Sequence, residues 1–108
     1  MPSMPSRGQI WWVRVPGLKE NKRFVVVSNN DRNRKLRDVL GTRMTTREKP
    51  QIDSIVEFPP GTATDTRTFL VADDIAAIDK DALVQTVGAL TPAQMSKVDE
   101  ALKAALDL

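Results

Sequence analysis

Arg23 and the adjacent threonines Thr45 and Thr46 are the residues whose chemistry stands out in this chain of 108 residues. Arg23 opens the β-like run 23–30, and the threonines follow the next apolar run. We therefore expect a fixed positive charge and two hydroxyls near the ends of two paired strands. The chain contains no histidine and no cysteine. If it acts on a phosphodiester, guanidinium and hydroxyl groups must do the work that imidazole does in other enzymes.

The composition is that of a single domain that lacks the commonest metal ligands. A chain of this length suits one modest core, and no run is long enough to span a bilayer, so we expect no membrane partner. The missing cysteine fits a cytoplasmic location, and the missing histidine predicts no metal or other cofactor. Residues 1–6 lack the centre of a signal peptide, which predicts no export and a disordered tail before a domain at 7–108.

The charge is distributed unevenly along the chain. Residues 1–50 hold 12 Lys/Arg and 4 Asp/Glu, a balance of +8. Residues 51–108 hold 4 Lys/Arg and 10 Asp/Glu, a balance of −6. This asymmetry favours a cationic face that meets an anion such as nucleic acid or an acidic peptide. The alternative is that solvated surface charges happen to cluster.

Short apolar runs between turn residues predict a mainly β fold with α. Strands are expected at residues 9–15, 24–27, 37–44, 52–58, 68–72 and 84–87, with one helical turn at 32–35. A helix is predicted over Pro92–Leu106, because Thr91 and Gln94 fit a capping box and apolar residues recur at spacings of three and four. These elements are typical of a small curled sheet or partly open barrel with a C-terminal helix.

Five segments of the chain match, in order, the pattern of one protein family. They are Arg-Gly-Gln-Ile-Trp at 7–11, Arg-Phe-Val-Val-Val-Ser-Asn at 23–29, Arg-Met-Thr-Thr at 43–46, Val-Ala-Asp-Asp-Ile at 71–75, and Gly-Ala-Leu-Thr-Pro at 88–92 followed by Val-Asp-Glu-Ala-Leu at 98–102. No single segment is specific to the family, but five segments in this order and at suitable spacing are. The chain thus resembles the MazF/PemK/Kid group of bacterial toxins from toxin–antitoxin pairs.

The resemblance implies an SH3-like, partly open β-barrel of the CcdB/PemK type with a C-terminal helix, assembled as a homodimer. It also implies a cytoplasmic endoribonuclease toxin that cleaves single-stranded RNA, mRNA included, at short sequences without a metal and so inhibits translation. A cognate acidic antitoxin protein would neutralise it. The family's catalytic arginine and hydroxyl residue fall on Arg23 and Thr45, with Thr46 as the alternative hydroxyl because the two threonines are adjacent.

Cleavage of RNA without a metal uses the 2′-hydroxyl as an internal nucleophile. The enzyme must stabilise the extra negative charge on the phosphate while the 5′-oxygen leaves. Arg23 suits this task, because its planar fork of donors matches two phosphate oxygens. It is a poor general base, since the pKa of arginine exceeds about 12. Thr45 can donate to the same phosphate, or it can be a strand-end hydroxyl that bonds the backbone.

Further residues could hold the RNA strand. Cations can contact phosphates, and asparagines can bond base edges or make turns. One of the two adjacent tryptophans can be core while the other stacks on a base or packs in a dimer. Asp73 and Asp74 can be loop hydrogen-bonders, or they can contact base amino groups. The set predicted to bind RNA is Trp12, Asn29, Asn30, Arg43, Thr46, Arg47, Lys49 and Asp74.

The chain departs from the family pattern near these residues. Phe24 and Arg43 stand where proline is usual, Asp74 replaces a glutamine, and the loop before Arg23 is short. Two alternative functions follow. One is a non-catalytic toxin of the same fold that binds a protein target, like the gyrase poison CcdB, although CcdB works through a C-terminal Trp-Gly-Ile and this chain ends in Leu-Asp-Leu. The other is an inert relative that binds RNA.

Overall fold

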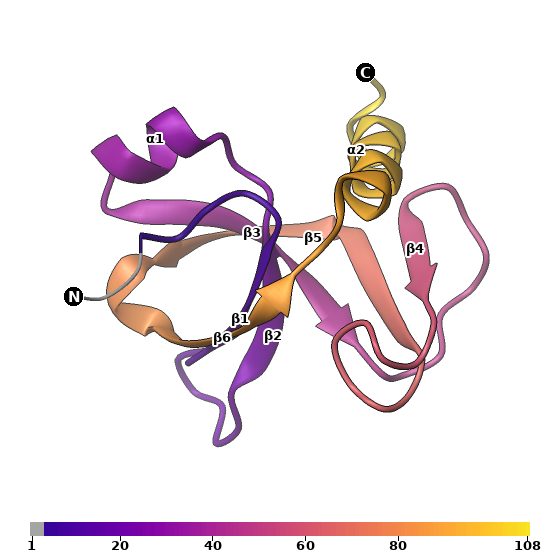
Figure 1. The fold of residues 1–108 in the computed structure, drawn as a ribbon, viewed down its shortest axis with the longest axis horizontal. Coiled ribbons are helices and arrows are strands. Elements are labelled where there is room, and N and C mark those ends of the chain that lie inside the picture. The colour runs from indigo at the N-terminus through magenta and orange to yellow at the C-terminus, as the bar shows by residue number, and fades with distance from the viewer. Residues whose placement is uncertain (1–3) are drawn as a thin grey trace.

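Six antiparallel strands form one curved sheet in the computed structural model, which describes residues 4–108 (Figure 1). The strands are β1 Gln9–Val13, β2 Lys22–Val26, β3 Asp38–Thr45, β4 Ile55–Phe58, β5 Thr68–Asp79 and β6 Leu83–Ala89. Their order across the sheet is β4-β5-β3-β2-β1-β6, so β4 and β6 are free edges and the barrel stays open. The prediction of a mainly β, partly open barrel is confirmed.

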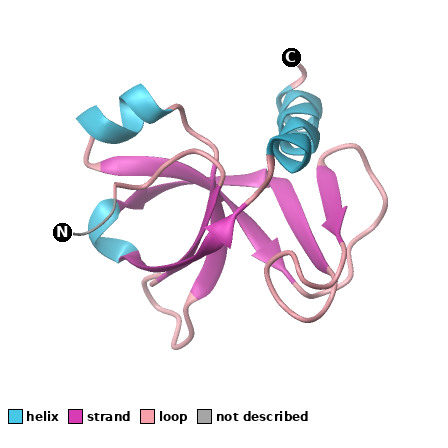
Figure 2. Ribbon diagram, viewed as in Figure 1, coloured by secondary structure: helices cyan, strands magenta, loops and turns pink. Residues whose placement is uncertain are grey.

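Two helices accompany the sheet, and Figure 2 shows them over separate parts of it. They are α1, Asn30–Lys35, which contacts β3, and α2, Pro92–Leu106, which packs on β4 and β5. A short 3-10 turn, Lys80–Ala82, joins β5 to β6. The predicted C-terminal helix is therefore confirmed, and the predicted helical turn at 32–35 is part of α1.

Apolar side chains form two clusters, one on each face of the sheet. Successive side chains of β2 point to opposite faces, so Val25 belongs to the first cluster while Phe24 and Val26 belong to the second. The buried members of the first cluster, which α2 covers, are Ile10, Val25, Met44, Val56, Phe58, Leu70, Ala72, Leu90, Met95, Val98 and Ala101. Those of the second are Trp11, Val13, Phe24, Val26, Val39 and Ile78.

A capping box starts α2 as the sequence predicts. The Thr91 hydroxyl accepts from the Gln94 backbone N–H at 3.2 Å, and the Gln94 side-chain oxygen accepts from the Thr91 N–H at 2.8 Å. Met95, Val98 and Ala101 are buried, which docks the apolar stripe of the helix on the sheet. No helix within residues 4–108 combines the length and apolar character needed to cross a membrane.

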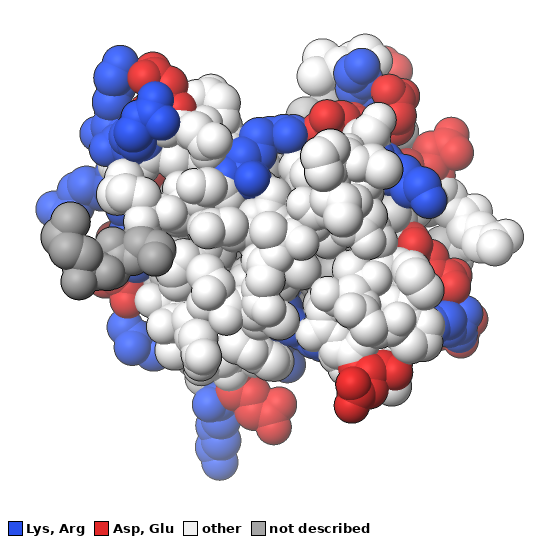
Figure 3. All heavy atoms as spheres, viewed as in Figure 1, with Lys and Arg blue, Asp and Glu red and all other residues white. Residues whose placement is uncertain are grey.

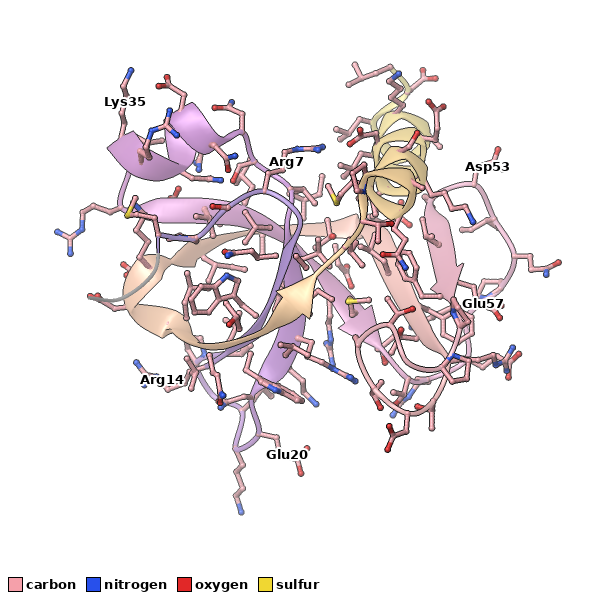
Figure 4. The ribbon with its side chains drawn as sticks, in the orientation of Figure 1. Arg7, Arg14, Glu20, Lys35, Asp53 and Glu57 are labelled. Atoms are coloured by element: carbon pink, nitrogen blue, oxygen red, sulfur yellow. The ribbon has the colours of Figure 1, made fainter. Side chains whose placement is uncertain are left out.

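Arg7 ties the N-terminal segment to both helices. Its backbone N–H donates to the Asn30 side-chain oxygen at 2.7 Å, and its Nε donates to the Val27 carbonyl at 2.9 Å. Its guanidinium also pairs with Asp99 on α2. Figure 4 shows Arg7 in the gap between α1 and α2. These bonds hold the start of the chain against the middle and the end of the fold.

The expected disordered tail at 1–6 falls only partly within the structure. Residues 1–3 lie outside the described residues. Pro5 is buried, and the Ser6 backbone N–H donates to Gln9 Oε1 at 2.7 Å. The chain therefore makes contacts with β1 from Ser6 onward.

β5 departs most from the sequence prediction. It continues to Asp79, whereas the predicted strand ends at Ala72. The prediction that Asp73 and Asp74 lie in a loop is wrong, because both lie within this strand. Two adjacent acidic residues look like a turn in the sequence, but both carboxylates are exposed here and need no turn to reach solvent.

A bulge explains how β5 holds these two residues. Its register with β3 steps from Val71 opposite Arg43 to Ile75 opposite Thr42, which leaves residues 72–74 without partners on β3. Such a bulge bends a strand and redirects its side chains. It lets the first half of β5 pair with β4 while the second half pairs with the start of β3.

Leu70→Ala should destabilise the fold far more than Leu106→Ala. Leu70 is 0% exposed in the cluster beneath α2, so truncation leaves a cavity that costs about 2–5 kcal/mol. Leu106 is 53% exposed at the end of α2, and the same substitution there should change stability by about 0.5 kcal/mol or less. Urea unfolding followed by circular dichroism measures both. Equal midpoints for the two variants would contradict the placement of the core.

Candidate nucleic-acid interface

The pairing of β2 with β3 brings Arg23 and the two threonines to the same end of the sheet. Arg23 lies directly opposite Met44, the residue before Thr45, and opposite Trp12 on β1. Residues that face each other across strands point to the same side. Arg23, Trp12 and Met44 therefore share one face, and Thr45 leaves the opposite face at the same level of the sheet.

Arg23 packs against an aromatic ring at this end of the sheet. Its guanidinium carbon lies 5.2 Å from the centre of the Trp12 ring, within cation–π range. Burial lowers the pKa of Arg23 from its ordinary value, because desolvation disfavours the charged form. Trp11 is buried in the second cluster. One tryptophan is thus core and the other supports Arg23, consistent with the expected opposite orientations.

An open groove of about 550 Å³ lies on the Thr45 face, over β3 and β5. It is lined by Lys22, Arg43, Thr45, Thr46, Arg47, Lys49, Val71 and Asp74. Six of these were singled out from the sequence, whereas Lys22 and Val71 were not. Arg23 does not line the groove, since it lies beside it on the other face.

The cations of this groove have no anionic partner among residues 4–108. None of Lys22, Arg43, Arg47 and Lys49 forms an ion pair there. The Nε atom of Arg43 is buried and also lacks a hydrogen-bond partner within that range. A buried donor without a partner is costly. The unpaired charges of the four groove cations are open to an anionic ligand. The groove is therefore able to bind an anion.

The cations of α1 are arranged differently. Arg32 pairs with Asp38 at 2.7 Å, and Asp31 pairs with Lys35 at 3.1 Å and with Arg34 at 3.5 Å. Figure 3 shows this group of charges over α1 as blue and red side chains close together. The basic half of the chain thus splits into a paired cluster on α1 and an unpaired one in the groove.

The Thr45 hydroxyl is oriented by the turn that follows β3. Its oxygen accepts from the Arg47 backbone N–H at 3.1 Å, so its own hydrogen remains free to donate. Thr46 is exposed just beyond the end of the strand. The expected bond between the Thr45 hydroxyl and the backbone is therefore present, and it leaves the hydroxyl able to donate to a ligand.

Asn29 and Asn30 are not brought to the groove. The Asn29 side chain caps α1 by accepting from the Arg32 N–H at 2.8 Å, and the Asn30 side chain accepts from the Arg7 N–H. Arg32 contacts Asp38 at the start of β3, about 23 Å along the strand from Thr45 at its end. The turn-making alternative is the one found, and the base-reading alternative is not supported by position.

Acidic side chains near the groove form no metal centre. Within residues 4–108 there is no group of three or more His, Cys, Asp or Glu side chains that could hold a metal ion. Asp73 accepts from the Ser54 hydroxyl at 2.7 Å, whereas Asp74 lines the groove.

The fold and the groove together define a class, a small open β-barrel protein able to bind an anionic partner. The family model described as PemK-like, MazF-like toxin of type II toxin–antitoxin system matches residues 6–106. The chain therefore belongs to this toxin family. The resemblance seen in the sequence is confirmed.

Individual relatives agree with this assignment. The endoribonucleases MazF4 of Mycobacterium tuberculosis and MazF1 of Mycobacterium bovis are each 36% identical over 104 residues, covering 96% of this chain and 94% of theirs. A solved mycobacterial endoribonuclease in complex with its cognate antitoxin is 36% identical, with a TM-score of 0.85 over 96% of both chains. A MazE–MazF structure from Deinococcus radiodurans has a TM-score of 0.82 at 17% identity, covering 99% of both chains, and supports the fold alone.

Removing groove cations should lower the affinity for single-stranded nucleic acid. It should also make that affinity less dependent on salt concentration. For Arg47→Ala with Lys49→Ala, the slope of log affinity against log salt should fall by about 1.4, since each phosphate contact contributes roughly 0.7 on a single strand. Arg34→Ala with Lys35→Ala removes the same charges from α1 and should leave the slope nearly unchanged. Fluorescence anisotropy with an uncleavable oligodeoxynucleotide measures both. Equal slopes would contradict the groove assignment.

Proposed function

We propose that this MazF-like endoribonuclease toxin cleaves single-stranded RNA without a metal ion, at the end of the sheet that carries both Arg23 and Thr45. The RNA backbone would follow the groove over β3 and β5. The observation that carries the proposal is the unpaired positive charge of the groove beside the Thr45 hydroxyl. Relatives named as endoribonucleases favour cleavage over the alternative of a non-catalytic toxin that binds a protein target.

The proposed chemistry uses the RNA's own 2′-hydroxyl. The 2′-hydroxyl gives its proton to a water molecule and its oxygen attacks the adjacent phosphorus, while the bond to the 5′-oxygen breaks and that oxygen takes a proton from water. The products are a 2′,3′-cyclic phosphate and a 5′-hydroxyl. Arg23 stabilises the added negative charge, and Thr45 donates a hydrogen bond to the same phosphate.

Cutting of a long RNA should proceed in excess EDTA. The fragments should carry a 2′,3′-cyclic phosphate and a 5′-hydroxyl, because the attacking group belongs to the RNA itself. Polynucleotide kinase labels a 5′-hydroxyl directly, so direct labelling of the new 5′ ends identifies that end group. Cleavage that needs added Mg²⁺, or fragments with 5′-phosphates, would show that another mechanism operates.

Arg23→Ala should lower the cleavage rate by at least 10²–10³, the typical effect of losing a preorganised donor to the transition state. Arg23→Lys should recover little, because an ammonium lacks the bidentate fork. Thr45→Ala should lose more rate than Thr46→Ala, since the Thr45 hydroxyl is the oriented one. Arg14→Ala, an exposed arginine outside the site, is the control. Near wild-type rates for Arg23→Ala, in a variant with an unchanged melting temperature, would refute the assignment.

The proposal includes a cognate acidic antitoxin that occupies the same groove. RNA and an acidic peptide both present closely spaced negative charge, and arginine forks match carboxylate as well as phosphate. An extended segment that orders on binding can cover a long groove. The mycobacterial relative solved with its cognate antitoxin supports such a partner.

The proposal also includes a homodimer that forms through the edge strand β6. This strand carries no charged residue, and Val84 and Val87 are 51% and 36% exposed. In Figure 3 the surface over β1 and β6 is nearly free of charged side chains. An uncharged, exposed sheet edge is an interaction site, because it offers unpaired backbone groups together with apolar surface.

Light scattering at tens of micromolar should therefore give the mass of a dimer. Val84→Glu should yield a monomer, because it buries a charge in the interface. Ile52→Glu, at an apolar residue 52% exposed near the opposite edge, should leave the dimer intact. A wild-type monomer, or equal effects of the two substitutions, would count against β6 as the interface.

A further inference from the structure

Asp74 is the single carboxylate among the residues that line the groove. Its neighbours there are four cations, two threonines and Val71. A carboxylate repels the phosphates that these cations attract, so it weakens nucleic-acid binding through charge alone. A hydrogen bond from the ligand to this carboxylate would compensate for the repulsion between it and the phosphates.

The bulge of β5 sends the two adjacent acidic residues to different surroundings. Asp73 is held by the Ser54 hydroxyl, outside the groove lining. Asp74 faces the groove over β3, next to the step in register between Arg43 and Thr42. Bulges of this kind occur beside active sites, where they redirect a side chain. Of the two carboxylates on this strand, that of Asp74 therefore lines the groove and that of Asp73 does not.

The carboxylate of Asp74 is not committed to a cation of the protein. No ion pair within 4.0 Å joins it to any Lys or Arg of residues 4–108, although four cations line the same groove. Asp74 is also exposed. Its two oxygens are therefore free to accept hydrogen bonds from a bound molecule.

We propose that Asp74 determines sequence preference by reading the Watson–Crick edge of one guanine in the RNA. This rests on the proposed function, since it assigns a recognition role within the same groove. Single-stranded RNA leaves that edge exposed, and sequence-specific proteins read it by hydrogen bonds. Guanine presents the N1–H and the N2 amino group side by side, which match the two oxygens of a carboxylate. Uracil presents acceptors on either side of one N–H and would be rejected by the negative charge.

The Arg43 guanidinium, which forms no ion pair among residues 4–108, and the Asp74 carboxylate have different roles in the groove. The guanidinium of Arg43 offers donors to phosphate or to base acceptors, whereas Asp74 offers only acceptors. Phosphate contacts fix the position of a strand, and base-edge contacts select its sequence. A well-formed bidentate contact discriminates against the wrong base by on the order of tenfold to a hundredfold.

The test is to map cut ends in an RNA pool of random sequence for the wild type, Asp74→Asn and Asp74→Gln. Asp73→Asn is the matched control, because it makes the same change at the adjacent residue outside the groove. The wild type should show guanine at one position of its motif. Asp74→Asn and Asp74→Gln should lose that preference at this position alone, by about tenfold or more, while Asp73→Asn keeps it.

A second measurement isolates the N2 amino group. A short RNA with inosine at that position lacks only this group, and kcat/KM of the wild type should fall by about tenfold. Asp74→Asn should cut the guanine and inosine RNAs at nearly equal rates, a coupling that a merely structural role of Asp74 would not produce.

The proposal is overturned if the variants keep the wild-type motif, if every position weakens uniformly, or if Asp73→Asn behaves like Asp74→Asn. It is also overturned if the motif contains no guanine. A wild-type protein that neither cuts nor binds RNA would overturn the proposed function as well, so the two failures are distinguishable.

Discussion

The antiparallel register between β2 and β3 is the constraint on which the candidate site depends. It sets Arg23 opposite Met44, and so brings the charge level with the end of the strand that carries Thr45. A slip of one residue would send Arg23 to the other face of the sheet and break its stack on Trp12. Val25 and Met44 prevent this slip, since both are fully buried in the cluster beneath α2. Packing of the core thereby fixes the geometry of the chemistry.

Electrostatics separates the groove from the rest of the basic half of the chain. Exposed ion pairs such as those of Asp31 contribute about 0–1 kcal/mol each, so the paired charges of α1 add little to stability. The four groove cations lie near one another without anionic partners among residues 4–108, which costs stability until an anion binds. Burial of Arg23 acts in the same direction, because a phosphate can replace the solvation that this guanidinium has lost.

Local patterns in the sequence predicted much of the fold and six of the eight residues that line the groove. The capping box at Thr91 and Gln94 fixed the start of α2, and the β-branched run after Arg23 identified β2. What the sequence could not supply was non-local. The bulge in β5 depends on its pairing with both β3 and β4, and it makes Asp73 and Asp74 strand residues. Lys22 was missed for the same reason, since only the folded sheet brings it to the groove.

The path of the RNA across the end of the sheet is the central claim, and a crystal structure of the protein with an uncleavable RNA tests it most directly. The RNA would carry a 2′-deoxy nucleotide at the cut site. The scissile phosphate should lie within hydrogen-bonding distance of the Arg23 guanidinium and the Thr45 hydroxyl, with neighbouring phosphates along Arg43, Arg47 and Lys49. An RNA that instead crosses α1 or β6, with no phosphate at Arg23, would contradict this path.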